Sequence, residues 1–148
     1  MATTYTTQTI TITPGSLTTG SARESASVTT DTAQNVNDYR ITVKVTMPNI
    51  ALTGSKAVFV WVKTSDDAGT TWDGNGTSSD AAITLDSPHQ FPLGCVLPCT
   101  INVARAASFS LKAACGGSIP ATWGIIIENQ TGQTFSSSAV TCKEEYNT

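Results

Sequence analysis

Acidic side chains crowd one short stretch of the chain, and they are the first residues that suggest chemistry. Asp66, Asp67 and Asp73 lie close together in sequence, and a pair of carboxylates is what glycoside hydrolysis requires. The stretch continues through residues 73–77 (Asp-Gly-Asn-Gly-Thr) to Asp80, and side-chain oxygens are the ligands that Ca²⁺ prefers. Because the final acidic ligand of an EF-hand is missing, we predict a solvated loop and no bound metal.

The remaining reactive side chains are one histidine and four cysteines. His89 lies in a proline-rich segment, and no Gly-x-Ser-x-Gly nucleophile elbow accompanies it, so we predict no catalytic residue and no enzyme activity. Cys95 and Cys99 have a spacing close to half a zinc site, but Cys115 and Cys142 are far apart. Buried reduced thiols are the favoured interpretation, and a disulfide or a bound metal stays an alternative. We expect no cofactor.

A turn motif overlaps the acidic stretch. Ser65, Asp67, Gly69, Thr71 and Trp72 follow the pattern S-x-D-x-G-x-T-W, which resembles the Asp-box of sialidase-like propellers, a structural hairpin turn away from the catalytic centre. An Asp side chain that accepts backbone N–H bonds, with a Gly free to take positive φ, closes a tight turn. One copy in a chain too short for a propeller predicts a hairpin turn and no sugar hydrolysis.

Composition narrows the range of partners. The net charge is −3 and the eight Lys and Arg residues are scattered singly, so the sequence offers no basic patch for phosphates and nucleic acid is not an expected partner. No apolar run approaches the ~20 residues that span a bilayer, and residues 1–20 lack an apolar signal segment. We therefore expect synthesis in the cytosol and no membrane contact.

Two segments carry the clearest strand patterns. Residues 39–47 alternate strictly, with the apolar side chains facing inward and the polar ones facing water. Residues 56–65 place three valines on one side and Phe59 and Trp61 on the other, so both faces need cover. The other predicted strands are residues 1–13, 25–30, 81–85, 100–104, 109–113, 121–128 and 134–143. Residues 87–98 contain three prolines and are predicted to form an ordered loop.

These segments predict an all-β chain with almost no helix. We expect a single-domain β-sandwich or jelly roll of about eight antiparallel strands, with a small barrel as the alternative. Residues 1–37 are predicted to form an extended N-terminal strand or arm and a polar connection. Residues 38–148 are predicted to form the sandwich, and 1–148 to be one structural unit.

Apolar residues at outward positions predict a surface that other molecules cover. We expect the chain to be a homo-oligomer. The predicted interface residues are Tyr5, Ile10, Ile12, Leu17, Phe59, Trp61, Trp72 and Ile126.

Four stretches carry a resemblance to a known family. They are residues 20–25 (Gly-Ser-Ala-Arg-Glu-Ser), 39–45, 58–74 and 120–132 (Pro-Ala-Thr-Trp-Gly-Ile-Ile-Ile-Glu-Asn-Gln-Thr-Gly). They resemble small structural proteins of tailed-phage virions, over residues 15–142. The resemblance implies a non-enzymatic decoration or cement protein on the capsid surface, made in the cytoplasm of the bacterial host. Its implied partners are the major capsid protein and further copies of itself, as a dimer or trimer. The cysteines are not part of the family pattern.

Two other functions stay open. A tail or head-to-tail connector protein would be present in few copies per particle, whereas a decoration protein covers the capsid. A carbohydrate-binding β-sandwich would use Trp61 or Trp72 as a stacking platform.

Overall fold

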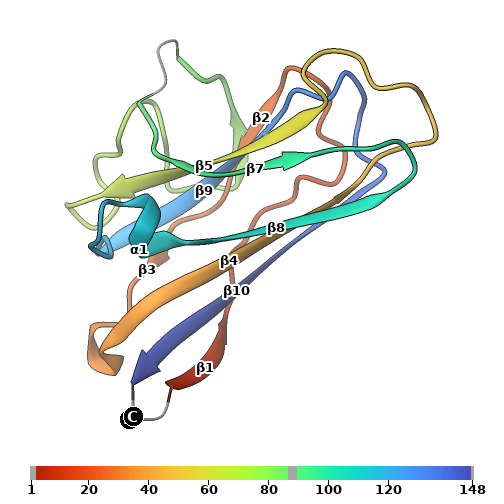
Figure 1. The fold of residues 1–148 in the computed structure, drawn as a ribbon. Coiled ribbons are helices and arrows are strands. Elements are labelled where there is room, and N and C mark those ends of the chain that lie inside the picture. Colours follow the sequence, from red (N-terminus) through yellow and green to blue (C-terminus); the bar gives the residue numbers. More distant parts are fainter. Residues whose placement is uncertain (1–2, 87–89, 148) are drawn as a thin grey trace.

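The chain folds into two antiparallel β-sheets that pack face to face (Figure 1). The computed structural model describes residues 3–86 and 90–147, and within these it contains ten strands. The prediction of an all-β sandwich is confirmed, with more strands than expected. The jelly roll stays a prediction. In the described residues no helix has the length and apolar character needed to cross a bilayer.

The smaller sheet has the strand order β1-β10-β4-β8 and the larger one the order β6-β2-β9-β5-β7. The smaller sheet consists of β1 (Thr3–Gln8), β10 (Ser137–Asn147), β4 (Val36–Thr46) and β8 (Ala104–Ser110). The larger sheet consists of β6 (Ala81–Ile83), β2 (Ala22–Glu24), β9 (Thr122–Asn129), β5 (Ala57–Ser65) and β7 (Leu93–Pro98), with β3 (Val28–Thr29) also paired to β9. Two short helices, η1 (Thr32–Gln34) and α1 (Leu111–Ala114), complete the fold.

The core lies between the two sheets and follows the alternation in the sequence. The predicted inward residues 39, 41, 43 and 45 on β4, and residue 47 just after it, are all buried. They meet the three valines of β5 and the inward side chains of β9, including Trp123, whose ring centroid lies 4.9 Å from that of Tyr39. Each such buried side chain contributes about 1.5–3 kcal/mol. The residues of β4 and β5 that face the core were therefore predicted correctly.

A polar contact ties three strands together at one end of this core. The buried Tyr39 hydroxyl donates to Glu144 Oε1 at 3.0 Å, and Thr6 Oγ donates to Glu144 Oε2 at 3.0 Å. Burial is the largest cause that raises the pKa of Tyr39 to about 12, and the hydrogen bond to Glu144 is the next largest. The contact links β1, β4 and β10.

Two predicted segments differ from the structure. The expected loop at residues 87–98 contains the strand β7, and residues 87–89 lie outside the described part. β7 lies at the edge of its sheet between Pro92 and Pro98, where a missing N–H group costs no ladder bond. The expected strand pair at residues 100–104 and 109–113 is a single strand, β8, followed by the one-turn helix α1. Ser110 caps this helix by accepting the Ala113 N–H at 2.9 Å.

The N-terminal segment takes part in both sheets. β1 pairs along its length with β10, and after the buried Ile10 the chain crosses to the larger sheet. There β2 pairs with β6 and β9, a strand that the polar sequence of residues 16–37 did not indicate. The weak strand expected near residues 25–30 is β3.

Candidate functional site

The predicted Phe59 and Trp61 pair lies on the outer face of the larger sheet, directed away from the core. In the register of β5 and β9, Phe59 lies opposite Glu128 and Trp61 lies opposite Ile126. Because side chains alternate along a strand, Lys63 points to the same outer face. The chain's own loops cover the part of this face around Lys63, which we call the covered half. The part around Glu128 is open, and we call it the open half.

The covered half is held by a buried ion pair. The Lys63 side chain is 0% exposed, and its Nζ donates to Glu24 Oε2 at 2.6 Å, to the Ser25 carbonyl at 2.6 Å and to the Thr77 carbonyl. Glu24 also accepts the Thr77 N–H at 2.8 Å and its hydroxyl at 2.6 Å. Burial lowers the pKa of Lys63, and the Glu24 carboxylate opposes this shift. The pair fastens the loop after β5 onto the sheet.

The turn after β5 has the contacts expected of its motif. Asp67 Oδ1 accepts the Ser65 hydroxyl at 2.8 Å and the Thr71 N–H at 2.7 Å. Gly69 has φ 87° and donates its N–H to Ser65 Oγ at 2.9 Å. The hydrogen bonds from Thr71 and Ser65 lower the pKa of Asp67 to about 2. Trp72 is only 8% exposed and lies with its ring 4.7 Å from Lys63 Nζ, which leaves it little surface for a sugar.

The expected hairpin at this turn is wrong. β5 pairs with β7 and β9, and the next strand, β6, pairs with β2. Between β5 and β6 the chain returns to β5 through a backbone bond from Asp73 N to the Thr64 carbonyl at 3.1 Å. The motif therefore folds a loop over the sheet and does not connect two paired strands.

Two other acidic residues of this stretch also make contacts within the fold, whereas Asp66 is exposed. Asp73 accepts the Thr64 hydroxyl, and Asp80 pairs with Arg23 at 2.6 Å and accepts the Thr13 hydroxyl at 2.8 Å. In the described residues no group of three His, Cys, Asp or Glu side chains is arranged to hold a metal ion. His89 lies outside the described residues.

The four cysteines are free in the structure, with Cys99 and Cys142 buried and Cys95 and Cys115 half-buried. Burial raises the pKa of Cys95 and Cys115 to about 11 and that of Cys142 to about 12. These thiols are held in their protonated form at neutral pH, which makes them poor nucleophiles.

The residues predicted as an interface fall into two groups. Ile10, Trp72 and Ile126 are buried within the chain, the last in a small cluster with Phe91 and Ala22. Their side chains therefore present almost no surface to a partner. The others keep accessible surface: Ile12, Leu17, Phe59 and Trp61 are half-buried, and Tyr5 is 54% exposed.

The open half of the face forms what we call the outer groove, which has Glu128 and Gln130 at its centre. Glu128 Oε2 accepts the Trp61 indole N–H at 2.9 Å, and Glu128 Oε1 accepts the Gln130 side-chain N–H at 2.7 Å. The rings of Phe59 and Trp61 are nearly parallel, at 11° with centroids 5.9 Å apart. Together with Ser55, these residues line a hollow of about 470 Å³.

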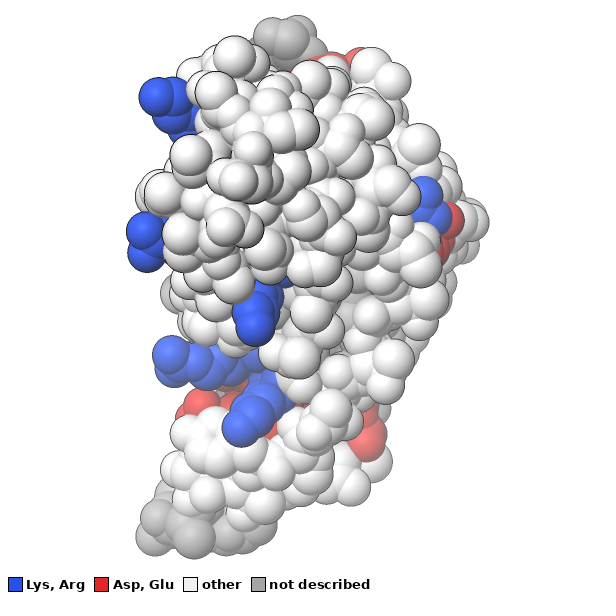
Figure 2. Space-filling view, turned by 90° about the vertical axis from the view of Figure 1, so that its right-hand side faces the viewer, with Lys and Arg blue, Asp and Glu red and all other residues white. Residues whose placement is uncertain are grey.

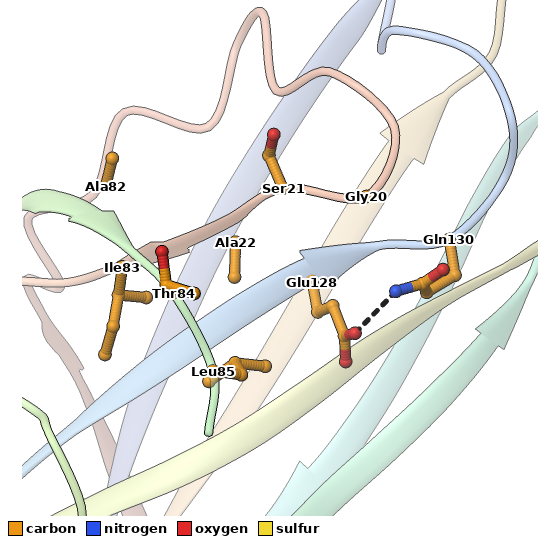
Figure 3. A pocket seen from close by; sticks show the side chains of 9 residues that line it. All are labelled: Gly20, Ser21, Ala22, Ala82, Ile83, Thr84, Leu85, Glu128 and Gln130. Carbon is orange, nitrogen blue, oxygen red and sulfur yellow. Dashed lines mark hydrogen bonds between the residues drawn. The ribbon is translucent and has the colours of Figure 1, made fainter. Parts of the chain in front are cut away.

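A second hollow of about 400 Å³ continues the outer groove on the other side of Glu128 (Figure 3). Glu128 and Gln130 point toward each other along one wall, and the other walls come from the β2 and β6 region. The remaining lining residues are Gly20, Ser21, Ala22, Ala82, Ile83, Thr84 and Leu85. Both hollows have the size typical of small-ligand sites, roughly 300–1,000 Å³.

A second exposed surface lies at one end of the sandwich. Ile50, Ile101 and Val103 are 56%, 43% and 38% exposed, and an Asn102 N–H bond to the Pro48 carbonyl at 3.2 Å joins their two loops. With the half-buried Leu52 we call these aliphatic residues the apolar tip. Figure 2 looks onto this end and shows a broad surface without charged side chains, with Lys and Arg along one side.

Sequence reasoning missed both Glu128 and the apolar tip. Glu128 resembles any polar strand residue until the register places it opposite Phe59, where it accepts the Trp61 indole N–H. The tip residues lie in loops, where no alternation marks them. Compared with known proteins, the chain matches no family model and no curated protein sequence.

Proposed function

We propose that this chain is a non-enzymatic structural protein of a tailed-phage virion that decorates the capsid. Its binding partner is the major capsid protein lattice, on which it assembles as a dimer or trimer. The resemblance of residues 15–142 to such proteins supports the proposal, and so does the rigid all-β sandwich. The absence of a catalytic role is supported by Asp67, Asp73 and Asp80, which all make contacts within the fold.

The apolar tip is the observation that carries this proposal. Three large aliphatic side chains are exposed in two loops that a backbone bond joins. Contiguous exposed apolar surface rimmed by polar residues marks protein contact sites. Because a backbone bond joins the two loops, the tip loses little conformational entropy on docking. Many copies on one lattice then multiply a modest contact.

The test is binding to purified capsids that lack decoration protein. We expect the chain to co-sediment with them at a copy number that covers the lattice. Ile101→Asp should weaken binding by more than about tenfold, because it places a charge in the contact. The control is Ala121→Asp, which should bind as the parent chain does. Ala121 is exposed and directly precedes Thr122, which pairs with Ser65 at the end of β5 that lies away from the Ile50 loop.

Three results bear against the proposal. Failure of the parent chain to bind capsids would exclude the decoration role. Equal binding by Ile101→Asp and the parent chain would exclude the tip as the contact. A few copies per particle, located at the tail by imaging, would favour the connector function instead.

A further inference from the structure

We propose that the outer groove is a binding site for a neutral saccharide chain. The inference goes beyond the virion role and stands without it, since the residues that line the groove and those of the apolar tip are different. It rests on the fixed Glu128 carboxylate, the aromatic pair beside it and the polar lining of both hollows.

The carboxylate of Glu128 is held in one orientation by neutral donors. One oxygen accepts the indole N–H of Trp61 at 2.9 Å and the other accepts the side-chain N–H of Gln130 at 2.7 Å. Each oxygen has two lone-pair sites, so one acceptor position remains on each. Two acceptors fixed side by side match the two hydroxyl groups of a vicinal diol, a group found in most sugars.

The aromatic pair supplies the apolar part of the site. Phe59 and Trp61 lie nearly parallel beside Glu128 and are half-buried. Aromatic side chains combine a large apolar surface with a polar handle, which suits the C–H groups of a pyranose ring. The hydroxyl groups of the same ring would face Glu128 and Gln130.

The second hollow extends the site past Glu128. Its walls carry the short hydroxyl side chains of Ser21 and Thr84 as well as the apolar Ala22 and Ile83. Glu128 and Gln130 line both hollows, so two successive sugar units would lie on either side of this polar pair. The groove thus fits a chain better than a single sugar.

The charge and polarity of the groove favour a neutral saccharide over an anionic ligand and over a cationic side chain. Among the described residues that line the two hollows there is no Lys or Arg, and the anionic Glu128 repels phosphates and acidic sugars. A cationic side chain is the competing ligand, because carboxylate and aromatic rings both attract cations. The first hollow contains the hydroxyl side chain of Ser55, and the second contains those of Ser21 and Thr84. These groups favour a polyhydroxylated chain over one long cationic side chain.

The experiment titrates the full chain with cellohexaose, maltohexaose and hexa-N-acetylchitohexaose, with hexa-arginine as the cationic probe. Trp72 and Trp123 are buried whereas Trp61 is half-buried, so tryptophan emission reports on the groove. We expect saturable binding of at least one hexasaccharide, with Kd below about 1 mM. Calorimetry provides the second readout.

Variants locate the site. Trp61→Ala should weaken saccharide binding by more than about tenfold, and Glu128→Gln by roughly tenfold, because it removes the charge that strengthens the hydrogen bonds. Tyr5→Ala is the matched control, since Tyr5 is an exposed aromatic residue on the other sheet. Far-UV circular dichroism should show that all three variants keep the parent fold.

Three outcomes would overturn the inference. They are no saturable binding of any hexasaccharide up to about 10 mM, tighter binding of hexa-arginine than of every saccharide, and saccharide binding that Trp61→Ala leaves unchanged. Each is separate from capsid binding, so the virion role can fail while this site holds.

Discussion

Replacing Lys63 by methionine tests how the loop after β5 is held on the sheet. The substitution keeps the length of the side chain but removes the cation from a site where Lys63 and Glu24 are 0% and 2% exposed. Three hydrogen bonds from the ammonium are lost, each contributing about 1.5–3 kcal/mol. The unfavourable burial of the ammonium is removed as well. Breaking one side of a buried ion pair typically costs about 3–5 kcal/mol, which is the loss we expect.

Urea unfolding followed by tryptophan fluorescence measures this loss, because unfolding exposes the buried Trp72 and Trp123. For a domain of this size the same loss lowers Tm by roughly 6–20 °C. Lys44→Met is the matched control, since Lys44 is an exposed lysine in the middle of β4. It should change the free energy of unfolding by less than about 0.5 kcal/mol.

A double variant separates the energy of the Lys63–Glu24 interaction from the effects of the two single substitutions. Lys63→Met combined with Glu24→Leu removes both charges, and apolar replacement of a whole buried pair is often close to neutral. Thr77 then loses its acceptor for two bonds, so some destabilisation remains. We expect the double variant to lose at least about 1 kcal/mol less than the two single losses added together. A loss below about 1 kcal/mol for Lys63→Met alone would refute the reasoning.

Three further predictions concern the turn after β9, the core and the thiols. Gly132→Ala should cost more than about 2 kcal/mol in urea unfolding, because Gly132 has φ 85° and an added Cβ would lie 2.6 Å from Thr53 N. Gly116→Ala, with φ 74° and open space around it, should cost about 1 kcal/mol; equal losses would contradict the clash. Tyr39 has a pKa of about 12 in the fold against 10 when unfolded, so its neutral form is favoured by folding. Its contribution of about 2–3 kcal/mol should be intact below pH 10 and lost as the pH rises to 12, a slope in pH-dependent unfolding that Tyr39→Phe should flatten. Cys95, with a pKa of about 11, should react with a disulfide reagent at pH 8 roughly a hundredfold more slowly than an unfolded cysteine, and labelling as fast as in urea would show an accessible thiolate.

The sheet framework could be predicted because strand alternation is local information. Residues 39–47 show which side faces the core without any knowledge of their neighbours. The strand β7 was missed because Pro92 and Pro98 look like breaks, and only the strand order shows that they bound an edge strand. The helix α1 is a single turn, too short for any helical period to appear.

The candidate site depended on information that the sequence does not contain. Phe59 and Trp61 were predicted to face outward, but their polar partner Glu128 comes from β9, about seventy residues further along the chain. Pairing between distant strands is set by the whole fold and leaves no local pattern. Lys63 was missed for the opposite reason: a lysine is almost never fully buried, and only its contact with Glu24 explains the exception.

A glycine on β9 accounts for the covered half of the outer face. Gly124 lies opposite Lys63 in the register, and an added Cβ there would lie 2.6 Å from Lys63 Cε. The missing side chain gives the lysine room to lie across the sheet to Glu24, and this contact brings the loop down over β9. The next outward position along β9 is Ile126, which is buried in a cluster with Phe91 and Ala22, and the one after it is Glu128. Glu128 lines the open hollows, while its neighbour Trp61 packs against the same cluster. A site that is open yet supported from one side is preorganised for a ligand, because little side-chain freedom is left to lose on binding.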